Sequence, residues 1–287
     1  MIPQAECAPA KVNLSLHVVG KRPDGYHELE MLVAFCDIGD RIEISTSTAF
    51  GLQITGPFAQ WLDASPSNLV WRAAEVLRDH CGGEQCGSAV LRLEKNLPVA
   101  SGIGGGSSDA AAAIRALRHY WKLQIDDVEI VKLALQLGAD VPMCLSSRPC
   151  RVSDIGEKIE QIELPPLHLV LVNPGIPLST ASVFANKSPS NLDPPQVISH
   201  FHDTDSVVDH LRLCRNDLQQ SAIELVPEIA HCLQALDKQP NIRLSRMSGS
   251  GATCFGLFPS HEAANLAQAS LSQQYPEWWV HSTQTLT

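Results

Sequence analysis

The stretch "ASGIGGGSSDAAAA", residues 100–113, decides the fold, because it joins a flexible loop directly to a helix. Its glycines are Gly102, Gly104, Gly105 and Gly106. Glycine lets the backbone adopt positive φ or approach another group closely, whereas the alanines at 110–113 have high helix propensity. A loop of this kind leaves the first amides of the helix unpaired, at the positive end of the helix dipole. The arrangement is typical of phosphate-binding sites.

Two common phosphate-binding motifs do not fit this loop. The Walker motif ends in Gly-Lys-Ser/Thr, but Gly106 is followed by Ser107. The dinucleotide-binding motif needs a third glycine where this chain again has Ser107, and it needs the loop to follow a strand directly. The predicted strand instead ends near Pro98. The loop therefore belongs to another class of phosphate-binding protein.

Composition predicts a globular protein of one large or two ordinary domains. The chain has 287 residues, of which 44% are hydrophobic and 18% charged. No apolar run is long enough to cross a membrane, and the N-terminus does not resemble a secretory signal. The net charge of −10, without a Lys/Arg block, argues against nucleic acid as a partner. The nine cysteines lack zinc-ligand spacing, which indicates buried free thiols in the reducing cytoplasm.

Hydrophobic patterns and helix signals predict a mixture of strands and helices. Strands are expected at 41–46, 88–98, 167–175 and 254–258. Helices are expected at 68–83, from the glycine loop to about 123, and at 127–137, 217–236 and 262–274. The elements do not alternate strictly, which favours an α+β fold over a doubly wound sheet. We expect an N-terminal ATP-binding domain at 1–158 and a C-terminal domain at 159–287 that completes the substrate site.

The loop itself carries the first family resemblance. Residues 98–108 read Pro-x-x-x-Gly-x-Gly-Gly-Gly-Ser-Ser. This pattern resembles the ATP-binding signature of the galactokinase, homoserine kinase, mevalonate kinase and phosphomevalonate kinase superfamily. The resemblance implies a two-domain α+β fold with the active site in the cleft between the domains. It also implies ATP as phosphoryl donor with Mg²⁺, for which Ser108 is a possible ligand.

Further motifs extend the resemblance from residue 8 to about residue 258. They are "APAKVNLSLHVVGKRPDGYHELEM" (8–31), "GADVPMCL" (138–145), "GIPLSTASVF" (175–184), "NDLQ" (216–219) and "RMSGSGATCFGLF" (246–258). In this order they are similar to the branch of the superfamily that acts on a cytidine-diphosphate-linked methylerythritol. The resemblance implies a small-molecule kinase that phosphorylates the 2-hydroxyl of 4-diphosphocytidyl-2-C-methyl-D-erythritol with ATP, in the non-mevalonate route to isoprenoids.

Asp140 and Lys11 are the expected catalytic pair. From the residues alone, Asp140 could equally be the N-cap of a following helix, and a lone lysine is usually a solvated surface charge. The resemblance implies that Asp140 accepts the proton of the acceptor hydroxyl and that Lys11 polarises this hydroxyl. Asp109, in the first turn of its helix, is interpreted as a structural residue in preference to a catalytic one.

The resemblance also assigns binding residues for the two substrates. The adenine side of the ATP site matches Asn68, Leu69 and Lys95. The phosphates match Gly102, Gly104, Gly105, Gly106, Ser107 and Ser108. For the cytidyl substrate, Tyr26 and Phe184 are expected to stack on cytosine, His27 to read its edge, and Asn13, Asp140 and Thr180 to contact the acceptor. The loop that contains Gly249 and Gly251 is expected to close on the active site.

Two alternative functions remain open at this point. A kinase of the same superfamily could act on homoserine or mevalonate, but a small acceptor offers no base on which Tyr26 and Phe184 could stack. A catalytically inactive nucleotide-binding regulator could use the same scaffold, although Lys11, Asp140 and the whole glycine loop are present. The expected partner is a small-molecule substrate, without nucleic acid or membrane, and the expected assembly is a monomer or weak homodimer.

Overall fold

The structure is a computed structural model that describes residues 4–23, 27–83, 86–187 and 200–287. Its strands are β1 (Gln4–Lys21), β2 (His27–Thr46), β3 (Gly51–Thr55), β4 (Ala89–Glu94), β5 (Cys150–Asp154), β6 (Lys158–Gln161), β7 (His168–Asn173), β8 (Leu244–Met247), β9 (Cys254–Phe258) and β10 (Trp279–Gln284). Its helices are α1 (Leu69–His80), α2 (Gly105–Tyr120), α3 (Asp127–Leu135), α4 (Val141–Ser146), α5 (Thr180–Ala185), α6 (Thr204–Leu213), α7 (Gln219–Leu225), α8 (Glu228–Asp237) and α9 (His261–Gln274), with the 3₁₀ turn η1 (Ala59–Trp61).

The residues form two compact units, each built from several segments of the chain. Unit 1 contains residues 1–10, 39–99 and 104–147, and unit 2 contains residues 11–38, 100–103 and 148–287. The long strands β1 and β2 contribute residues to both units. The domain boundary expected between residues 158 and 159 stays a prediction.

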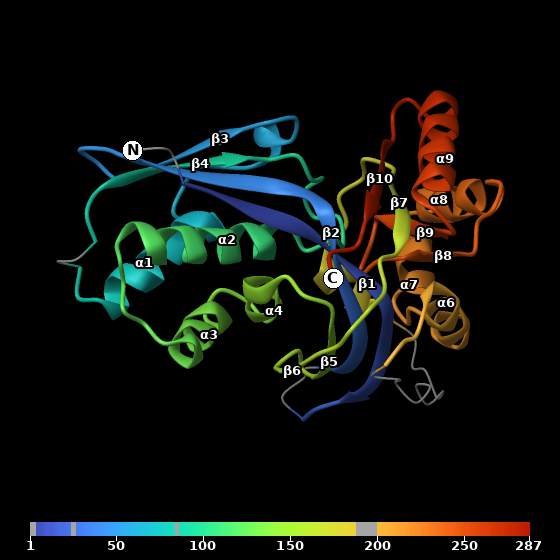
Figure 1. Cartoon of the computed structure of the whole chain (residues 1–287), viewed down its shortest axis with the longest axis horizontal. Helices are drawn as coiled ribbons and strands as arrows, with labels where there is room; N and C mark the ends of the chain where they lie inside the picture. Colours follow the sequence, from blue (N-terminus) through green and yellow to red (C-terminus); the bar gives the residue numbers. More distant parts are fainter. Residues whose placement is uncertain (1–3, 24–26, 84–85, 188–199) are drawn as a thin grey trace. The chain divides into compact units, whose positions relative to one another are not determined.

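Unit 1 combines a sheet with four helices. Strand β4 pairs antiparallel with residues 41–46 of β2 and parallel with β3. Helices α1 to α4 lie together on one side of β3 and β4 (Figure 1), where α2 packs against α1 and α4. The alanines at positions 110–113 of α2 are completely buried, and their small side chains let neighbouring helices approach closely.

Unit 2 contains two groups of antiparallel strands. Residues 29–33 of β2 pair with β5, which pairs with β6. The other sheet has the order β10-β7-β9-β8, with α9 packed against β10 and β7 and α8 against β8 and β9 (Figure 1). Five of the six residues of β7 and all five of β9 are buried, as their nearly continuous apolar sequences predict.

Most expected elements are present, with two clear differences. The strands expected at 88–98, 167–175 and 254–258 appear as β4, β7 and β9, and the strand expected at 41–46 is the last part of the much longer β2. The single helix expected at 217–236 is wrong: it divides into α7 and α8 around Pro227. Proline lacks the N–H that a continuous helix would need at that position.

The long strand β1 was not predicted, although its sequence carries a strand signal. Polar and apolar residues alternate from Lys11 to Val18, and both faces of the strand are covered, since residues 8–18 are buried without interruption. In β2 the buried run covers residues 31–36, and alternation appears only beyond residue 40, where the strand was recognised.

The cysteines are free thiols, as expected. Seven are buried, Cys81 is half-buried and Cys7 is exposed, so Cys7 departs from the expectation of buried thiols. Across the described segments, no helix combines the length and apolar character needed to cross a membrane.

Candidate active site

Helix α2 begins at Gly105, and its N-cap residue Gly104 adopts a left-handed conformation with φ of +64°. The first helical residues, Gly105, Gly106 and Ser107, are half-buried or exposed. Their backbone N–H groups belong to the unpaired amides of a helix N-terminus, and the dipole of this 16-residue helix favours an anion there. The first turn of α2 therefore has the geometry of a phosphate-binding site.

The two serines of this turn have different surroundings. The Ser108 hydroxyl is buried and donates a hydrogen bond of 2.7 Å to the carbonyl oxygen of Pro9. Ser107 is half-buried. Because the Ser108 proton is already donated inside the protein, Ser107 is the better placed of the two to meet a ligand.

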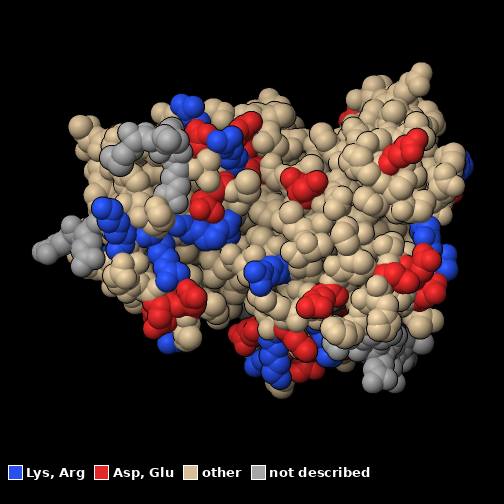
Figure 2. All heavy atoms as spheres, in the orientation of Figure 1, with Lys and Arg blue, Asp and Glu red and all other residues tan. Residues whose placement is uncertain are grey.

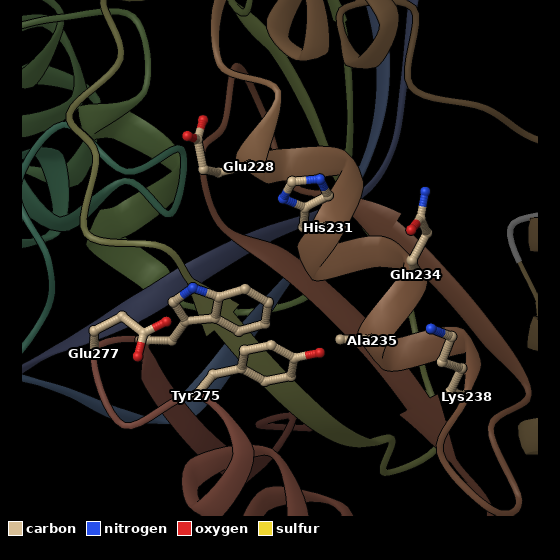
Figure 3. A pocket seen from close by; sticks show the side chains of 8 residues that line it. Glu228, His231, Gln234, Ala235, Lys238, Tyr275 and Glu277 are labelled. Atoms are coloured by element: carbon tan, nitrogen blue, oxygen red, sulfur yellow. The ribbon is translucent and has the colours of Figure 1, made fainter.

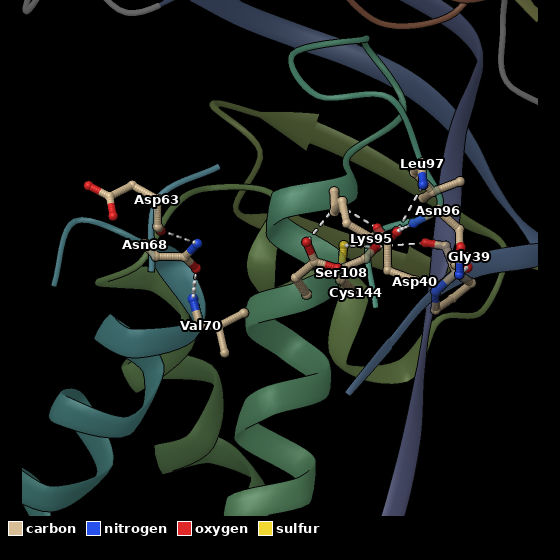
Figure 4. Close-up of polar contacts among 12 residues, drawn as sticks. Gly39, Asp40, Asp63, Asn68, Val70, Lys95, Asn96, Leu97, Ser108 and Cys144 are labelled. Atoms are coloured by element: carbon tan, nitrogen blue, oxygen red, sulfur yellow. Dashed lines mark hydrogen bonds and ion pairs between the residues drawn. The ribbon is translucent and has the colours of Figure 1, made fainter. Parts of the chain in front are cut away.

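Two residues expected on the adenine side lie at the start of α1. The Asn68 side chain caps this helix by accepting from the Val70 N–H at 2.9 Å, and it donates to the Asp63 carbonyl oxygen at 3.0 Å (Figure 4). Leu69 lies beside the glycine loop, since a Cβ on Gly106 would be 3.5 Å from its Cδ1. The fold therefore brings the start of α1 next to the first turn of α2.

Lys95, like Ser108, differs from the other expected ATP residues because it is almost completely buried, with 2% of its surface exposed. Its Nζ lies 2.5 Å from an Asp40 oxygen and 2.6 Å from an Asp109 oxygen, and both carboxylates are buried. Burial raises the pKa of Asp109 to about 8, against the opposing effect of Lys95. The ammonium group thus contacts protein carboxylates, which residue patterns alone did not indicate.

Asp140 lies at the N-cap position of α4, directly after Gly138 and Ala139. Its side chain makes no cap hydrogen bond to this helix, and the residue is half-buried. The capping role that the sequence left open is therefore not realised by the carboxylate.

Lys11 lies in β1, in unit 2, and is only 4% exposed. Its neighbours Ala10 and Val12 are completely buried, and its N–H donates to the Ile103 carbonyl oxygen at 2.9 Å. A solvated surface lysine is thus excluded. This backbone bond ties β1 to the segment that leads into the glycine loop.

Asn13, two residues farther along β1, has a buried side-chain oxygen, Oδ1, without a hydrogen-bond partner among the described residues. Its Nδ2 lies 3.1 Å from the Met31 sulfur. Gly249 lies beside this oxygen, since a Cβ there would be 3.3 Å from it. A buried polar atom without a partner is costly, so a bound group that donates to this oxygen would stabilise the site.

His27, Thr180 and Phe184, which are also expected to bind the acceptor, lie in unit 2, whereas Asp140 lies in unit 1. The rings of His27 and Phe184 stack with centroids 5.0 Å apart and an interplanar angle of 26°. Burial, followed by the charges of Lys21 and Lys187, lowers the pKa of His27, which favours its neutral form. Thr180, at the start of α5, shares a 2.8 Å hydrogen bond with Ser250. Tyr26 lies outside the described residues.

Residues 248–253 form a loop that holds the segment 100–103. Ser248 accepts from the Asn13 N–H and donates to the Gly102 carbonyl oxygen, both at 3.0 Å. The Thr253 N–H donates to the Ser101 carbonyl oxygen at 3.0 Å. Asn216, in the "NDLQ" motif, supports the loop from behind by donating to the carbonyl oxygens of Met247 and Gly249, each at 2.8 Å.

Sequence reasoning assigned no role to Ser248 or Asn216, although the motifs that contain them were recognised. Both act within the protein, where their partners are backbone atoms of distant segments. The resemblance of these two motifs to those of the superfamily was the only signal in the sequence. The function of each side chain appears only when the chain is folded.

Replacing Ser248 with alanine is expected to lower the free energy of unfolding by about 1 to 3 kcal/mol. The change leaves the Asn13 N–H and the Gly102 carbonyl oxygen without a partner in a buried place. Urea denaturation measures the loss. Ser272→Ala, at an exposed position of α9, is the matched control and should change stability little. Equal effects of the two substitutions would contradict the bridging role of Ser248.

Comparison with known proteins identifies the family. The GHMP kinases N-terminal domain family matches residues 68–148, and the GHMP kinases C-terminal family matches residues 199–277. A 4-diphosphocytidyl-2-C-methyl-D-erythritol kinase from a Chelativorans species is 44% identical over 98% of this chain and 96% of its own length. The chain belongs to the 4-diphosphocytidyl-2-C-methyl-D-erythritol kinase family. The enzyme of that name from Agrobacterium fabrum is 47% identical over 98% of this chain and 96% of its own length.

Solved structures agree with this assignment. The crystal structure of a 4-(cytidine 5'-diphospho)-2C-methyl-D-erythritol kinase matches with a TM-score of 0.81 and 31% identity, covering 99% of this chain and all of that one. Homoserine kinase from Cytophaga hutchinsonii matches with a TM-score of 0.71 at 16% identity, covering 100% of this chain and 95% of that one. The match to homoserine kinase is evidence for a shared fold only. The α+β, two-domain kinase fold expected from the sequence is confirmed.

A separate pocket of about 310 Å³ lies in unit 2. It is lined by residues of α8, including His231, by Lys238 directly after this helix, and by Tyr275 (Figure 3), with Trp278 also in the lining. The two aromatic rings stack with centroids 3.9 Å apart. None of the residues that the sequence assigned to the active site lines this pocket.

Proposed function

We propose that this chain transfers the γ-phosphoryl group of ATP to the 2-hydroxyl of 4-diphosphocytidyl-2-C-methyl-D-erythritol, a step of the non-mevalonate route to isoprenoids. As a member of its family it is a small-molecule kinase with ATP as phosphoryl donor. The observation that carries the proposal is near-full-length identity of 44% to 48% with kinases named for this acceptor.

The proposed ATP site is the first turn of α2 with the start of α1. The unpaired N–H groups of residues 105–107 bind the phosphates, and Asn68 and Leu69 lie on the adenine side. The remaining residues of the proposed site are Lys95, Gly102, Gly104 and Ser108. Lys95 and Ser108 support it from within the protein, because their side-chain polar groups are engaged there.

Mg²⁺ is proposed to arrive as the ATP complex. Within the described segments, no cluster of three or more His, Cys, Asp or Glu side chains is placed to hold a metal ion. This fits Mg²⁺, which usually keeps several waters and is bound largely by substrate phosphates in kinases. Bound there, it would neutralise charge on the phosphate oxygens.

In the proposed reaction, the acceptor oxygen attacks the γ-phosphorus while the bond from that phosphorus to the β,γ-bridging oxygen breaks. ADP leaves with the bond electrons, and the hydroxyl proton passes to the Asp140 carboxylate. The Lys11 ammonium polarises the hydroxyl and offsets negative charge on the transferred group. Phosphoryl transfer requires mainly such positioning and charge stabilisation, because its transition state is loose.

The acceptor is proposed to bind through its cytosine. Neutral His27 has one donor and one acceptor nitrogen, which suits the edge of a base, while the Phe184 ring offers a stacking face and Tyr26 a second one. The unpartnered Asn13 oxygen accepts a hydrogen bond from the bound acceptor, and Thr180 makes a further polar contact. A homoserine or mevalonate molecule offers no base on which these rings could stack.

Replacing Phe184 with alanine is expected to raise the KM for the cytidyl substrate about ten-fold or more, because one stacking face for the base is lost. The KM for ATP should stay unchanged. Steady-state kinetics with each substrate varied in turn measure both constants. Phe201→Ala, which removes a half-buried ring packed against His210 in the same unit, is the control. An unchanged KM for the cytidyl substrate in Phe184→Ala would contradict stacking.

A single incubation tests the proposed reaction. Purified protein is mixed with MgATP and 4-diphosphocytidyl-2-C-methyl-D-erythritol, and the products are analysed by mass spectrometry. We expect a product heavier by one phosphoryl group, together with ADP, and neither with Asp140→Asn. Parallel incubations with homoserine and with mevalonate should give no phosphorylated product. Phosphorylation of one of these alone would reassign the acceptor.

The proposed setting is the cytoplasm, where ATP is available and free thiols stay reduced. We propose a monomer or weak homodimer that works without nucleic acid. In support, acidic groups lie among the basic ones on the face seen in Figure 2, and the chain carries a net charge of −10.

A further inference from the structure

Three charged side chains meet beneath the first turn of α2. Lys95 directs its ammonium group at Asp40 and Asp109, at 2.5 and 2.6 Å. The side chains are 2%, 0% and 4% exposed, respectively. When all three are ionised, one positive charge faces two negative ones. Burying such a cluster of charges costs desolvation free energy. A contribution to the stability of the fold therefore rarely explains by itself why the cluster is present.

Each carboxylate holds a different part of the phosphate site. The second oxygen of Asp40 accepts the backbone N–H groups of Asn96 and Leu97, at 2.5 and 2.9 Å (Figure 4). These residues lead from β4 into the glycine loop. Asp109 belongs to the N-terminal part of α2 itself. The Lys95 ammonium therefore connects the entry of the loop with the helix at which the loop ends.

The ammonium also lies directly under Gly105. A Cβ on Gly105 would be 2.9 Å from Lys95 Nζ and 3.6 Å from an Asp40 oxygen, so the space below this residue is filled. The backbone of Lys95 is held closely as well, since a Cβ on Gly56 would be 2.6 Å from its carbonyl oxygen. An ammonium fixed in this way supports the residue whose N–H opens the helix.

We propose that Lys95 is a positioning residue for phosphate binding: its ammonium group acts on Asp40 and Asp109, not on the nucleotide, and so fixes the first turn of α2. This inference rests on the proposed ATP site. By the same inference, Asp40 and Asp109 also position the first turn of α2. Neither carboxylate takes part in the proposed phosphoryl transfer. Loss of the ammonium leaves negative charge unbalanced beneath the position of the phosphates, which weakens anion binding there.

Compensating substitutions separate this role from direct contact with ATP. Lys95→Met should raise the KM for MgATP about ten-fold or more, because it leaves the Asp40 charge unpaired. Adding Asp40→Asn removes this charge but keeps an oxygen that accepts from Asn96 and Leu97. The double variant Lys95→Met/Asp40→Asn should therefore return the KM for MgATP to within about three-fold of the unmodified protein. The KM for the cytidyl substrate should stay unchanged throughout.

Lys132→Met is the matched control. Lys132 pairs with Glu129 at 2.9 Å on the surface of α3 and is 64% exposed, so losing this pair should change no kinetic constant. Circular dichroism confirms that each variant is folded at the assay temperature. If Lys95→Met does not fold, the double variant alone still tests the proposal: it lacks the ammonium group but should keep the KM for MgATP within about three-fold of the unmodified protein, whereas direct contact between Lys95 and the nucleotide predicts a large rise.

Calorimetric binding of a non-hydrolysable ATP analogue distinguishes failure of this inference from failure of the proposed function. Analogue binding that weakens in Lys95→Met and recovers in the double variant supports the inference, even if the cytidyl substrate is not phosphorylated. Weakened binding that the second substitution does not restore indicates direct contact with the nucleotide and overturns it. Unchanged binding in Lys95→Met also overturns it, and an unmodified protein that binds no analogue overturns both proposals.

Discussion

Asp140→Asn is expected to lower kcat by about 10²- to 10⁴-fold, the usual contribution of a positioned general base. Asparagine has nearly the same size but cannot accept the hydroxyl proton. The KM for MgATP should change little, since phosphate binding is proposed at the start of α2. Steady-state kinetics, with single-turnover measurements for the slow variant, determine both constants.

The structure supplies a matched control for Asp140. Asp126 occupies the N-cap position of α3 and does cap it, by accepting from the Glu129 N–H at 2.8 Å. Asparagine caps helices about as well as aspartate, so Asp126→Asn should leave kcat and stability nearly unchanged. If Asp140 were merely a cap, Asp140→Asn would be equally mild. A kcat within about three-fold of the unmodified protein would therefore refute the catalytic assignment.

The second large effect is expected for Gly102→Ala, which should lower the free energy of unfolding by about 3 kcal/mol or more. Gly102 has φ of +77°, and a Cβ there would lie 2.5 Å from the Ser248 carbonyl oxygen and 2.7 Å from the N and O atoms of Gly251. These are backbone atoms, so the whole contact between 100–103 and the 248–253 loop would have to shift. Urea denaturation measures the stability, and kcat/KM should fall as well.

Gly82→Ala separates the steric clash from the backbone strain. Gly82 has φ of +72°, close to that of Gly102, but a Cβ there would meet no atom within 4 Å. We expect this substitution to cost about 1 kcal/mol, the strain of a side chain at positive φ. If both glycine variants lose the same stability, the close contact of Gly102 with the 248–253 loop contributes nothing.

Local signals predicted much of the secondary structure because their causes are close in the chain. Asp126 caps α3 through a residue three positions away, and the alanine run of α2 favours helix through its own propensity. Pro227, which divides α7 from α8, is evident in the sequence, but the helical patterns on both sides of it led to the prediction of one continuous helix. Strand β1 carries a local signal as well, the alternation of polar and apolar residues from Lys11 to Val18, but this alternation was not used to predict a strand.

For the candidate site too, the sequence named the residues but did not reveal their surroundings. Recognised motifs named the glycine loop and Asp140, which are not fully buried, and Asn13, whose buried oxygen has no hydrogen-bond partner among the described residues. They also named Lys95 and Ser108, but their side-chain environments depend on partners elsewhere in the chain. Lys95 binds Asp40, which is 55 positions away, and Ser108 binds Pro9, which is 99 positions away.

The sequence by itself determined the helix starts, the glycine-rich turn before α2 and the family, because capping, propensity and motif order are properties of neighbouring residues. Only the tertiary structure decided which polar and charged side chains have their partners inside the protein. Ser248 meets Asn13 across 235 positions, and Lys95 meets two carboxylates in a space closed to water. The physical reason is burial: it changes a side chain's charge balance and hydrogen-bond partners through contacts that chain order does not reveal.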